Sequence, residues 1–336
     1  MAEIITFGSA CWDAFMKVKQ AKEVKSKKFI SQKGICFNLG SKIDIKDVFF
    51  FSGGGGTNSA ATFVNQGFKA EFCGMVGDDL LGKEVIDDLK KHKIGIDLIV
   101  KTPKKATNYS VVLKTSKATD RTILVFRGAS ELLTKKDIPW NRAKKAKWFY
   151  LAPLSGKLAK NTKDIVGFAK KNKIKVAFNP GNSQLCLAKK ELQDIIKKTD
   201  ILILNQEEAS LLTGIKYNKE KNIFKKIDDI CPGIAIMTKG PEGVSVSDGR
   251  HLFSAKGFKG NFIDNTGAGD AFGSGFVSGF LQSKGNVKYA IQLGMANSVS
   301  CLNHWGAKGG LLKKKQKFKK VKVKKEACLG HNCKLK

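Results

Sequence analysis

The sequence predicts an α/β fold: a three-layer α/β/α sandwich with a mostly parallel central sheet and a small β-sheet lid. Three observations predict it. From Trp148 onward, short apolar strands alternate with helical segments, which is the pattern of α/β proteins. These strands are apolar along nearly their whole length, as parallel strands covered on both faces are. Two β-rich patches, near residues 13–51 and 97–128, lie outside this alternation, and we expect them to join as the lid.

The expected elements follow one another without an internal repeat. A first strand ends at Gly8, a lysine-rich β segment follows, and a glycine-rich turn leads into an Ala-rich helix. A strand and a helix over residues 70–92 precede three short lid strands at 97–100, 109–113 and 122–126. The alternating part then contains strands at 148–152, 174–178, 201–205 and 233–238, helices at 158–171, 188–198 and 206–212, a hairpin at 243–255, and a helix from Asp270.

Length and composition exclude several classes of protein. The chain has 336 residues, enough for one large α/β domain, and its 42% apolar content and 34 glycines suit a folded enzyme. No run approaches the roughly 18–20 apolar residues of a membrane helix. The first strand begins at Glu3 without a basic-then-apolar leader, so we expect a cytoplasmic protein that does not enter a membrane.

The eight cysteines are scattered, which predicts reduced thiols rather than a disulfide framework. Four of them lie in apolar runs and are expected to be buried: Cys11, Cys36, Cys73 and Cys301. A cluster near the C-terminus, Cys328, His331 and Cys333, lacks the second matching pair of a zinc site, so metal binding there is the weaker interpretation.

The net charge of +32 has two interpretations. Only four of the 61 basic residues are arginine, and the lysines are spread over nearly every expected helix, which favours solvated surfaces over nucleic-acid recognition. A basic field would still favour capture of an acidic substrate such as a nucleotide. Residues 313–336 form a denser tail, with eleven lysines against one glutamate.

The stretch from Phe262 to Phe280 carries the strongest functional pattern. Gly267, Ala268 and Gly269 form a turn, and Asp270 opens a run with apolar residues at helical spacing. Free backbone N–H groups and the positive end of the helix dipole would bind an anion there. Asp270 is either a simple helix cap or a carboxylate that accepts a proton beside the anion, as phosphoryl transfer to a hydroxyl requires.

Three further loops follow strands at the edge where α/β sheets bind ligands. Four glycines at 53–56 let the backbone approach a ligand, or form only a flexible turn, before a helix capped by Thr57 or Asn58. Asn205 ends a strand and Glu208 lies in the first turn of a helix, where it is either a dipole partner or part of a hydrated Mg²⁺ site. Residues 238–243 end another strand and could admit nucleotide phosphates.

Taken together, these segments resemble the ribokinase family, the carbohydrate kinases also named for phosphofructokinase B. The resemblance covers residues 1–312, as a ribokinase-like domain, and leaves 313–336 as a lysine-rich tail. It rests on motifs in a shared order: G-S-x-x-x-D at 8–13, SGGGGTN at 52–58, NxxE at 205–208, T-K-G-x-x-G at 238–243 and DNTGAGDAF at 264–272.

The resemblance implies a role for each matching position. Asp270 would be the catalytic base, and the amides of Gly267, Ala268 and Gly269 the anion hole. Substrate hydroxyls would be held by Asp13, Gly54, Gly55 and Asn58. ATP would lie against Asn205, Thr238, Gly240, Gly243 and Asn297, the last at adenine. Glu208 would organise Mg²⁺ through water, and Asp264 and Thr266 would belong to a loop ordered by a monovalent cation such as K⁺. Many relatives dimerise through the lid, so a homodimer is expected.

The sequence departs from the family at two positions that matter for the substrate. Typical ribokinases carry Asn where this chain has Cys11, and a Lys within the glycine run where it has Gly55, so ribose itself is less expected. Two arginines in the expected lid, Arg121 and Arg127, are either surface charges or contacts to a substrate hydroxyl, carboxylate or phosphate, and Arg127 is our substrate-binding candidate.

The sequence therefore predicts an ATP-dependent kinase that phosphorylates a hydroxyl of a sugar or a related small molecule. A nucleoside kinase on the same fold is the nearest alternative, since the same glycine and aspartate positions would serve ribosyl hydroxyls. A lysine-rich nucleic-acid-binding protein that retains a kinase fold is a remote one.

Overall fold

The computed structural model describes residues 2–19, 22–26, 33–115, 121–258, 260 and 262–327. The cluster Cys328, His331 and Cys333, considered above as a metal site, lies outside the described residues.

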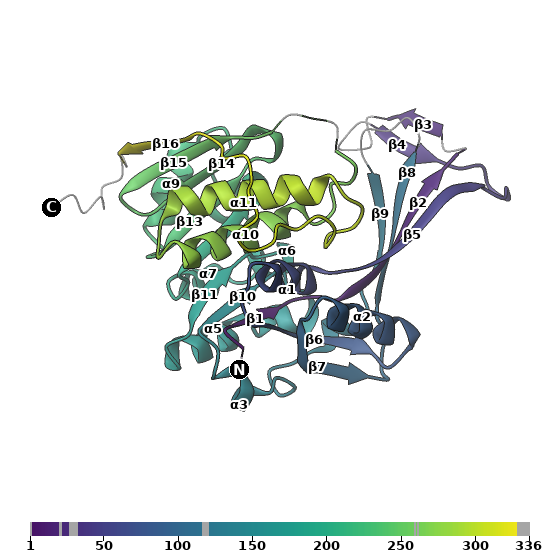
Figure 1. The fold of residues 1–336 in the computed structure, drawn as a ribbon, viewed down its shortest axis with the longest axis horizontal. Coiled ribbons are helices and arrows are strands. Elements are labelled where there is room, and N and C mark those ends of the chain that lie inside the picture. The colour runs from purple at the N-terminus through teal and green to yellow at the C-terminus, as the bar shows by residue number, and fades with distance from the viewer. Residues whose placement is uncertain are drawn as a thin grey trace.

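A ten-stranded sheet forms the centre of the molecule (Figure 1). Its parallel part, in spatial order, consists of β7 (Gly95–Thr102), β6 (Ala70–Gly77), β1 (Ile4–Phe7), β10 (Trp148–Leu151), β11 (Lys175–Phe178), β12 (Ile201–Asn205) and β13 (Ile234–Thr238). An antiparallel part continues it through β14 (Gly243–Ser247), β15 (His251–Lys256) and β16 (Val323–Ala327). Because β10 to β13 are buried almost throughout, both faces of the sheet are covered, as their apolar sequences predict.

Helices cover the two faces of this sheet and complete three layers (Figure 1). One layer holds α1 (Gly55–Asn65), α2 (Leu80–Lys91), α10 (Ala268–Gln282) and α11 (Val287–Leu302). The other holds α3 (Trp140–Ala143), α4 (Gly156–Lys160), α5 (Thr162–Lys171), α6 (Asn182–Leu185), α7 (Lys189–Ile196), α8 (Gln206–Thr213) and α9 (Glu220–Asp228), with the 3₁₀ turn η1 (Ala129–Leu132). A second 3₁₀ turn, η2 (Gly240–Glu242), follows β13. The predicted α/β sandwich is confirmed. Among the described helices none is long and apolar enough to cross a membrane.

The lid is a separate four-stranded sheet that projects from the body (Figure 1). Its spatial order is β5 (Ile45–Gly53), β2 (Cys11–Val18), β8 (Asn108–Thr115) and β9 (Arg121–Phe126), with a small hairpin of β3 (Lys22–Lys25) and β4 (Lys33–Cys36) beyond it. The prediction that residues 97–100 form a lid strand is wrong. Those residues belong to β7, whose Leu98 is fully buried beside Cys73 of β6. As an edge strand β7 is only half covered, so its sequence looks like a lid strand.

Part of the lysine-rich tail joins the main sheet. β16 pairs antiparallel with β15, and Lys325 of β16 lies opposite Phe253 of β15. Lys325 Nζ is 5.8 Å from the centre of the Phe253 ring. The tail is therefore attached to the sheet edge for part of its length. Charged side chains on such an outer strand also discourage pairing with a further strand.

The cysteine prediction holds for most of the chain but not for Cys36. Cys11, Cys73, Cys231 and Cys301 are buried free thiols, whereas Cys36 and Cys186 are free and exposed. Cys36 is exposed because the hairpin β3–β4 lies beyond the main lid sheet, where its apolar side chains are not packed into the core.

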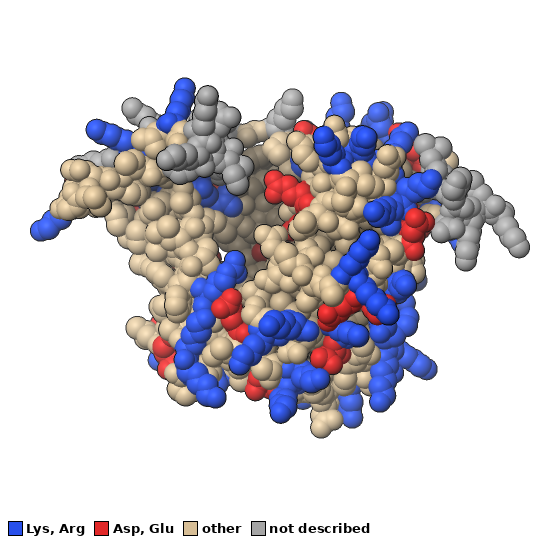
Figure 2. Space-filling model, turned by 180° about the vertical axis from the view of Figure 1, so that it is seen from behind, with Lys and Arg blue, Asp and Glu red and all other residues tan. Residues whose placement is uncertain are grey.

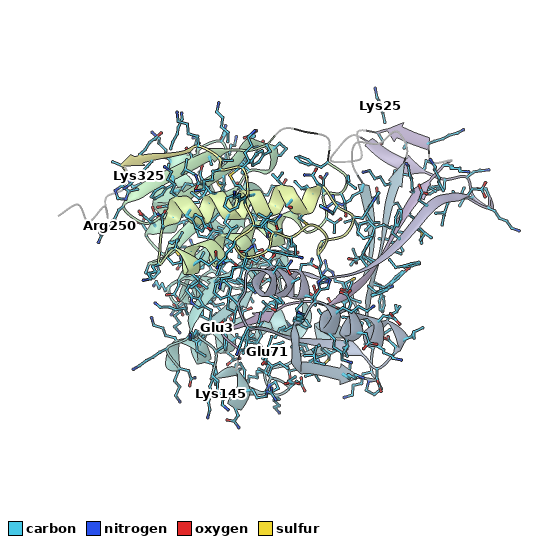
Figure 3. The ribbon with its side chains drawn as sticks, in the orientation of Figure 1. Glu3, Lys25, Glu71, Lys145, Arg250 and Lys325 are labelled. Atoms are coloured by element: carbon cyan, nitrogen blue, oxygen red, sulfur yellow. The ribbon has the colours of Figure 1, made fainter. Side chains whose placement is uncertain are left out.

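Lysines and arginines are distributed over much of the face of the molecule that Figure 2 shows. On the face shown in Figure 2, acidic residues lie among the lysines and arginines. The labelled residues in Figure 3 make the same point: Lys25 lies at the lid, Lys145 at the far end of the body, and Arg250 and Lys325 beside the antiparallel strands. This distribution favours solvated lysines over a nucleic-acid-binding surface.

Candidate active site

The turn at the start of α10 is a backbone anion site. Gly267 has a φ of 75°, and a Cβ there would clash with Ala307 Cβ and lie 2.9 Å from Ala307 Cα, so only glycine fits. The amides of Gly267, Ala268 and Gly269 donate no hydrogen bond within the described part of the chain. Ser298 Oγ donates to the Ala268 carbonyl at 2.9 Å and fixes the turn from α11. The turn therefore offers free donors at the positive end of a helix.

Asp270 lies three residues after Gly267, in the first turn of α10, and is half-buried. Asn58 Nδ2, on α1, donates to Asp270 Oδ2 at 2.9 Å. A Cβ at Gly55 would lie 3.3 Å from Oδ1, so the absence of a side chain at 55 leaves space beside that oxygen. Burial raises the pKa of Asp270 above its ordinary value, while the Asn58 hydrogen bond and the Lys308 ammonium lower it. Asp270 thus has one oxygen fixed and a basicity suited to accepting a proton.

A polar cavity of about 330 Å³ lies under the lid on one side of this turn. Asp13, Gly54, Arg127 and Thr266 line it, together with Ser9, Cys11, Asn108, Ser110, Val112, Ile123, Val125, Pro153, Leu154, Ser155, Gly181, Asn182 and Ser183. Asp13 is buried, and Ser110 Oγ donates to its Oδ1 at 2.5 Å. A cavity with a buried carboxylate and many hydroxyl and amide groups suits a small polyhydroxylated molecule.

A largely apolar cavity of about 310 Å³ lies on the other side of the turn. Thr238, Gly240 and Gly243 line it, as do Ala268 and Gly269 of the turn itself, with Phe258, Phe262, Phe272, Met295, Ser298, Val299 and Leu302 forming most of the rest. A flat apolar group such as a nucleobase fits such walls, and its phosphates would lie toward the free amides. The anion site therefore stands between two cavities of different chemistry.

Asn297 does not line the apolar cavity, and the prediction that it contacts adenine is wrong. Its side chain is fully buried. Asn297 Nδ2 donates to Thr62 Oγ1 and to the Ala271 carbonyl, and its Oδ1 accepts from Leu312 N. Those contacts tie α11 to α1, α10 and the following segment. The neighbouring residue Ser298 lines the cavity instead, because one step along a helix turns the side chain by about 100°.

Asn205 and Glu208 cap α8 reciprocally. Glu208 N donates to Asn205 Oδ1 and Asn205 N donates to Glu208 Oε2, both at 2.8 Å. Burial raises the pKa of Glu208, although the Asn205 amide opposes this. Neither residue lines either of the two cavities. The described residues contain no cluster of three or more His, Cys, Asp or Glu that could hold a metal directly. The free Oε1 of Glu208 suits contact through water.

Asp264 fixes the loop before the turn. Its Oδ1 accepts from Thr266 N and Oγ1, at 3.0 and 2.8 Å, and its Oδ2 accepts from Gly306 N at 3.2 Å. Asp264 is buried, and all three hydrogen bonds come from the chain itself. The described contacts of Asp264 are therefore those of a loop-ordering residue.

Contacts from the lid also reach this loop. Lys114 Nζ, on β8, donates to the Ile263 carbonyl at 2.8 Å and lies 5.5 Å from the centre of the Trp305 ring. Trp305 stacks on Phe49 of β5, with ring centres 5.3 Å apart. The lid and the loop that leads into the anion site are thus joined by direct contacts.

Sequence reasoning missed one buried charge at the site. Lys308, which follows α11, is 8% exposed and donates to the carbonyl and Oγ of Ser52, both at 2.7 Å. Its position inside the apolar run from Trp305 to Leu312 was the available signal. In a chain with so many surface lysines, that signal did not stand out.

A helix-start anion site with a half-buried carboxylate beside it, close to a polar and an apolar cavity on an α/β sandwich, is the arrangement expected of a small-molecule kinase. Sequence comparison agrees, because residues 29–313 match the pfkB family carbohydrate kinases. The chain belongs to this family. It is a carbohydrate kinase and thus an ATP-binding transferase.

The individual relatives compared here share less than a third of their residues with this chain. The chain is 29% identical over 268 residues to a ribokinase from Haemophilus influenzae, covering 77% of this chain and 83% of that protein. Among solved structures it is similar to a ribokinase from Thermotoga maritima, with 21% identity, a TM-score of 0.75, and 94% and 97% of the two chains covered. It is also similar to a nucleoside kinase from Methanocaldococcus jannaschii, with 20% identity, a TM-score of 0.72, and 92% and 95% covered. The structural likenesses show the fold alone.

Proposed function

We propose that the protein transfers the γ-phosphoryl group of ATP to a hydroxyl of a sugar or sugar-like acceptor, with Asp270 as the base. One observation carries the proposal: Asp270 and the free amides of residues 267–269 share one turn, whose Ala268 and Gly269 line the apolar cavity while Thr266, just before it, lines the polar one. An acceptor hydroxyl beside Asp270 and a phosphate at the amides would then be adjacent. Catalysis would come from positioning and from stabilising the transferring group's charge.

The residues at the polar cavity would hold the acceptor. Asp13, oriented by Ser110, accepts hydrogen bonds from acceptor hydroxyls, and the backbone at Gly54 and Gly55 approaches closely because it carries no side chains. Asn58 acts through Asp270, since its amide is bonded to that carboxylate. Lid contacts exclude water from the acceptor.

The nucleotide would lie in the apolar cavity with its phosphates toward Thr238, Gly240, Gly243 and the amides of the turn. Asn205 and Glu208 fit a hydrated Mg²⁺ through the free Glu208 oxygen, and they do not fit direct coordination. When bound, Mg²⁺ supplies positive charge to the β- and γ-phosphates. Asp264 and Thr266 would order their loop further if a monovalent cation bound there.

A coupled kinase assay tests this function. Sugars and nucleosides are each offered with ATP and Mg²⁺, with and without K⁺, and product formation is measured. We expect turnover with at least one sugar. Failure on every sugar, while the protein binds ATP, would contradict the proposed acceptor class.

A nucleoside acceptor is the second candidate. The lid contributes Val112, Ile123 and Val125 to the wall of the polar cavity, and a nucleobase could pack against these side chains. Turnover of adenosine, cytidine or inosine in the same assay, exceeding that of every sugar, would decide for this alternative.

Arg127 is expected to set affinity for the acceptor. It lines the polar cavity and forms no ion pair within the described residues. Arg127→Met should raise the acceptor KM by about 10–100-fold, the loss of one or two charge-assisted hydrogen bonds, with the ATP KM unchanged. Steady-state kinetics in both substrates measure this. Arg142→Met is the matched control, because Arg142 forms an exposed pair with Asp97 and neither residue lines the cavity. An acceptor KM equal to that of the wild type would remove Arg127 from the site.

The lid also carries an exposed apolar face, which supports a homodimer. Strand pairing places Phe50, Ala14, Val111 and Leu124 in one row across the sheet, with Phe50 and Leu124 exposed at its two ends and Ala14 fully buried between them. This row lies on the face opposite Ile123 and Val125, which face the cavity. Phe50 is 52% and Leu124 56% exposed. A second copy of the lid would cover this face.

Leu124→Asp is expected to shift the protein from dimer to monomer, because a carboxylate would be buried in the apolar contact. Light scattering after gel filtration measures the mass, which should fall from about twice the 36.7 kDa chain to a single chain. Leu211→Asp is the control, since Leu211 is 57% exposed on α8, away from the lid. A monomeric wild type, or a Leu124→Asp variant that stays dimeric, would contradict the proposed interface.

A further inference from the structure

Lys239 directly follows β13, beside the apolar cavity, but its side chain does not line that cavity, whereas its neighbours Thr238 and Gly240 do. Lys239 N donates to the Gly243 carbonyl at 2.8 Å, and Glu242 N donates to the Lys239 carbonyl at 3.0 Å. The backbone of Lys239 therefore closes the loop that contains η2. The lysine of the T-K-G-x-x-G segment lies at the base of this loop, and its side chain is directed elsewhere.

A triangle of contacts holds the Lys239 side chain on the face of the sheet opposite the cavity. Lys239 Nζ donates to Glu220 Oε2, at the start of α9, and to Ser245 Oγ on β14, both at 2.9 Å. Ser245 Oγ in turn donates to Glu220 Oε1 at 2.6 Å. Because α9 packs on one face of the sheet and the cavity is lined by residues of α10 and α11 on the other, the triangle holds the loop from behind the cavity.

This triangle is stronger than an ordinary surface ion pair. Only 16% of the Lys239 side chain and 28% of the Glu220 side chain are exposed, and Ser245 is fully buried. Charge-assisted hydrogen bonds with little solvent around them belong to the strong class, and removing one partner leaves the other charge poorly paired. The ammonium of Lys239 is thus engaged by Glu220 and Ser245, on the side away from the place where nucleotide phosphates would lie.

The composition of the loop explains why such a contact matters. Gly240 and Gly243 have φ values of 52° and 111°, in the region that favours glycine. Glycine also adopts many other backbone conformations, so these two residues permit the observed turn without enforcing it. A contact from outside the loop is then needed to select this shape, and the pairing of Lys239 with Glu220 provides it.

We propose that Lys239 and Glu220 are positioning residues for ATP: their ion pair, completed by Ser245, fixes the loop at 239–243 from behind the nucleotide cavity, and Lys239 itself does not bind the phosphates. The inference rests on the proposed function, in which ATP lies in the apolar cavity. Residues that line this cavity, such as Gly240, keep their place only while the loop keeps its shape. Breaking the pair should therefore weaken ATP binding without touching the acceptor cavity.

Two variants distinguish this positioning role from direct phosphate binding by the sign of the effect. Lys239→Met and Glu220→Gln each break the pair, so both should raise the Kd for MgATP by about 10-fold, the factor that one charge-assisted hydrogen bond contributes. The double variant should bind ATP no more weakly than either single one, because both changes remove the same contact. If Lys239 instead bound phosphate, Glu220→Gln would release the ammonium and lower the Kd. Calorimetric titration of the full chain with MgATP measures these values.

Two serines of β14 supply a matched control. Ser245→Ala removes the hydrogen bond to Glu220 at the first residue of α9, and Ser247→Ala removes the 2.8 Å hydrogen bond from Ser247 Oγ to Asp228 Oδ2 at the last residue of that helix. Both serines are fully buried, so the two variants should lose similar stability. Only Ser245→Ala should raise the Kd for MgATP, by about 2–10-fold. Equal increases in both variants would indicate general loosening of α9 and would overturn the proposal.

The titration needs no acceptor, so its outcome is separate from that of the sugar assay. A wild-type Kd in both Lys239→Met and Glu220→Gln would overturn the positioning role and leave the proposed function standing. A wild-type protein that does not bind MgATP would reject the nucleotide site and the positioning role together. With an acceptor that is turned over, its KM should stay at the wild-type value in both variants, a split that partial unfolding would not produce. If either variant does not fold, the comparison of Ser245→Ala with Ser247→Ala decides.

Discussion

Asp270→Asn is expected to lower kcat by about 10²–10⁴-fold, the usual contribution of a general base, with ATP affinity close to that of the wild type. The substitution is nearly isosteric, and the amide oxygen of the new side chain can still accept the hydrogen bond from Asn58 Nδ2. The anion site keeps its amides, because the turn at residues 267–269 is unchanged. Only proton acceptance is lost. Single-turnover kinetics and ATP titration measure the two quantities separately.

The same substitution is expected to raise stability at neutral pH. Burial puts the folded-state pKa of Asp270 above its unfolded value, so the folded protein loses stability as pH rises from the unfolded pKa through the folded one. The cost is complete once the pH exceeds the folded-state pKa, and asparagine does not carry it. Thermal unfolding should therefore show a higher Tm for Asp270→Asn. Asp194→Asn on α7, on the other side of the sheet, serves as the control for both measurements. Near-normal turnover of Asp270→Asn would reject Asp270 as the base.

The parts of the site that the sequence predicted are those encoded locally. The turn at 267–269 and the start of α10 lie within one short stretch, so glycine content and helical spacing were enough to place them. The start of α8 after Asn205, with Glu208 in its first turn, is likewise local. The alternating strands after Trp148 set the fold, because apolar strands need cover on both faces.

The parts that the sequence did not predict depend on contacts between distant segments of the chain or on the direction in which a single side chain points. Asn58 meets Asp270 across 212 positions, so its role as a partner of the base needed the fold. Asn297 and Ser298 differ by one step on α11, and only the packing decides which side chain faces the cavity. Position 55, where typical ribokinases carry Lys, is glycine in this chain. The buried ammonium of Lys308, far along the chain, donates instead to the nearby Ser52 carbonyl.

Gly267→Ala is expected to lower both stability and activity. The residue has a φ of 75°, a conformation that costs a non-glycine residue about 1–2 kcal/mol. The new Cβ would also clash with Ala307 Cβ and lie 2.9 Å from Ala307 Cα, so the turn or the 306–308 segment must move, at a further cost of about 1–3 kcal/mol. The free energy of unfolding should fall by the sum, measured by urea titration.

Activity should fall because the same movement displaces the amides that face the phosphate. Loss of one such donor typically costs about 10²–10³-fold in kcat. Gly269→Ala separates strain from simple addition of a methyl group: a Cβ there meets no atom within 4 Å, so its free energy of unfolding should not decrease. Stability loss in Gly269→Ala equal to that in Gly267→Ala would show that the turn does not depend on the left-handed glycine. A loss confined to Gly267→Ala would tie the anion site to its contact with the segment that also carries Lys308.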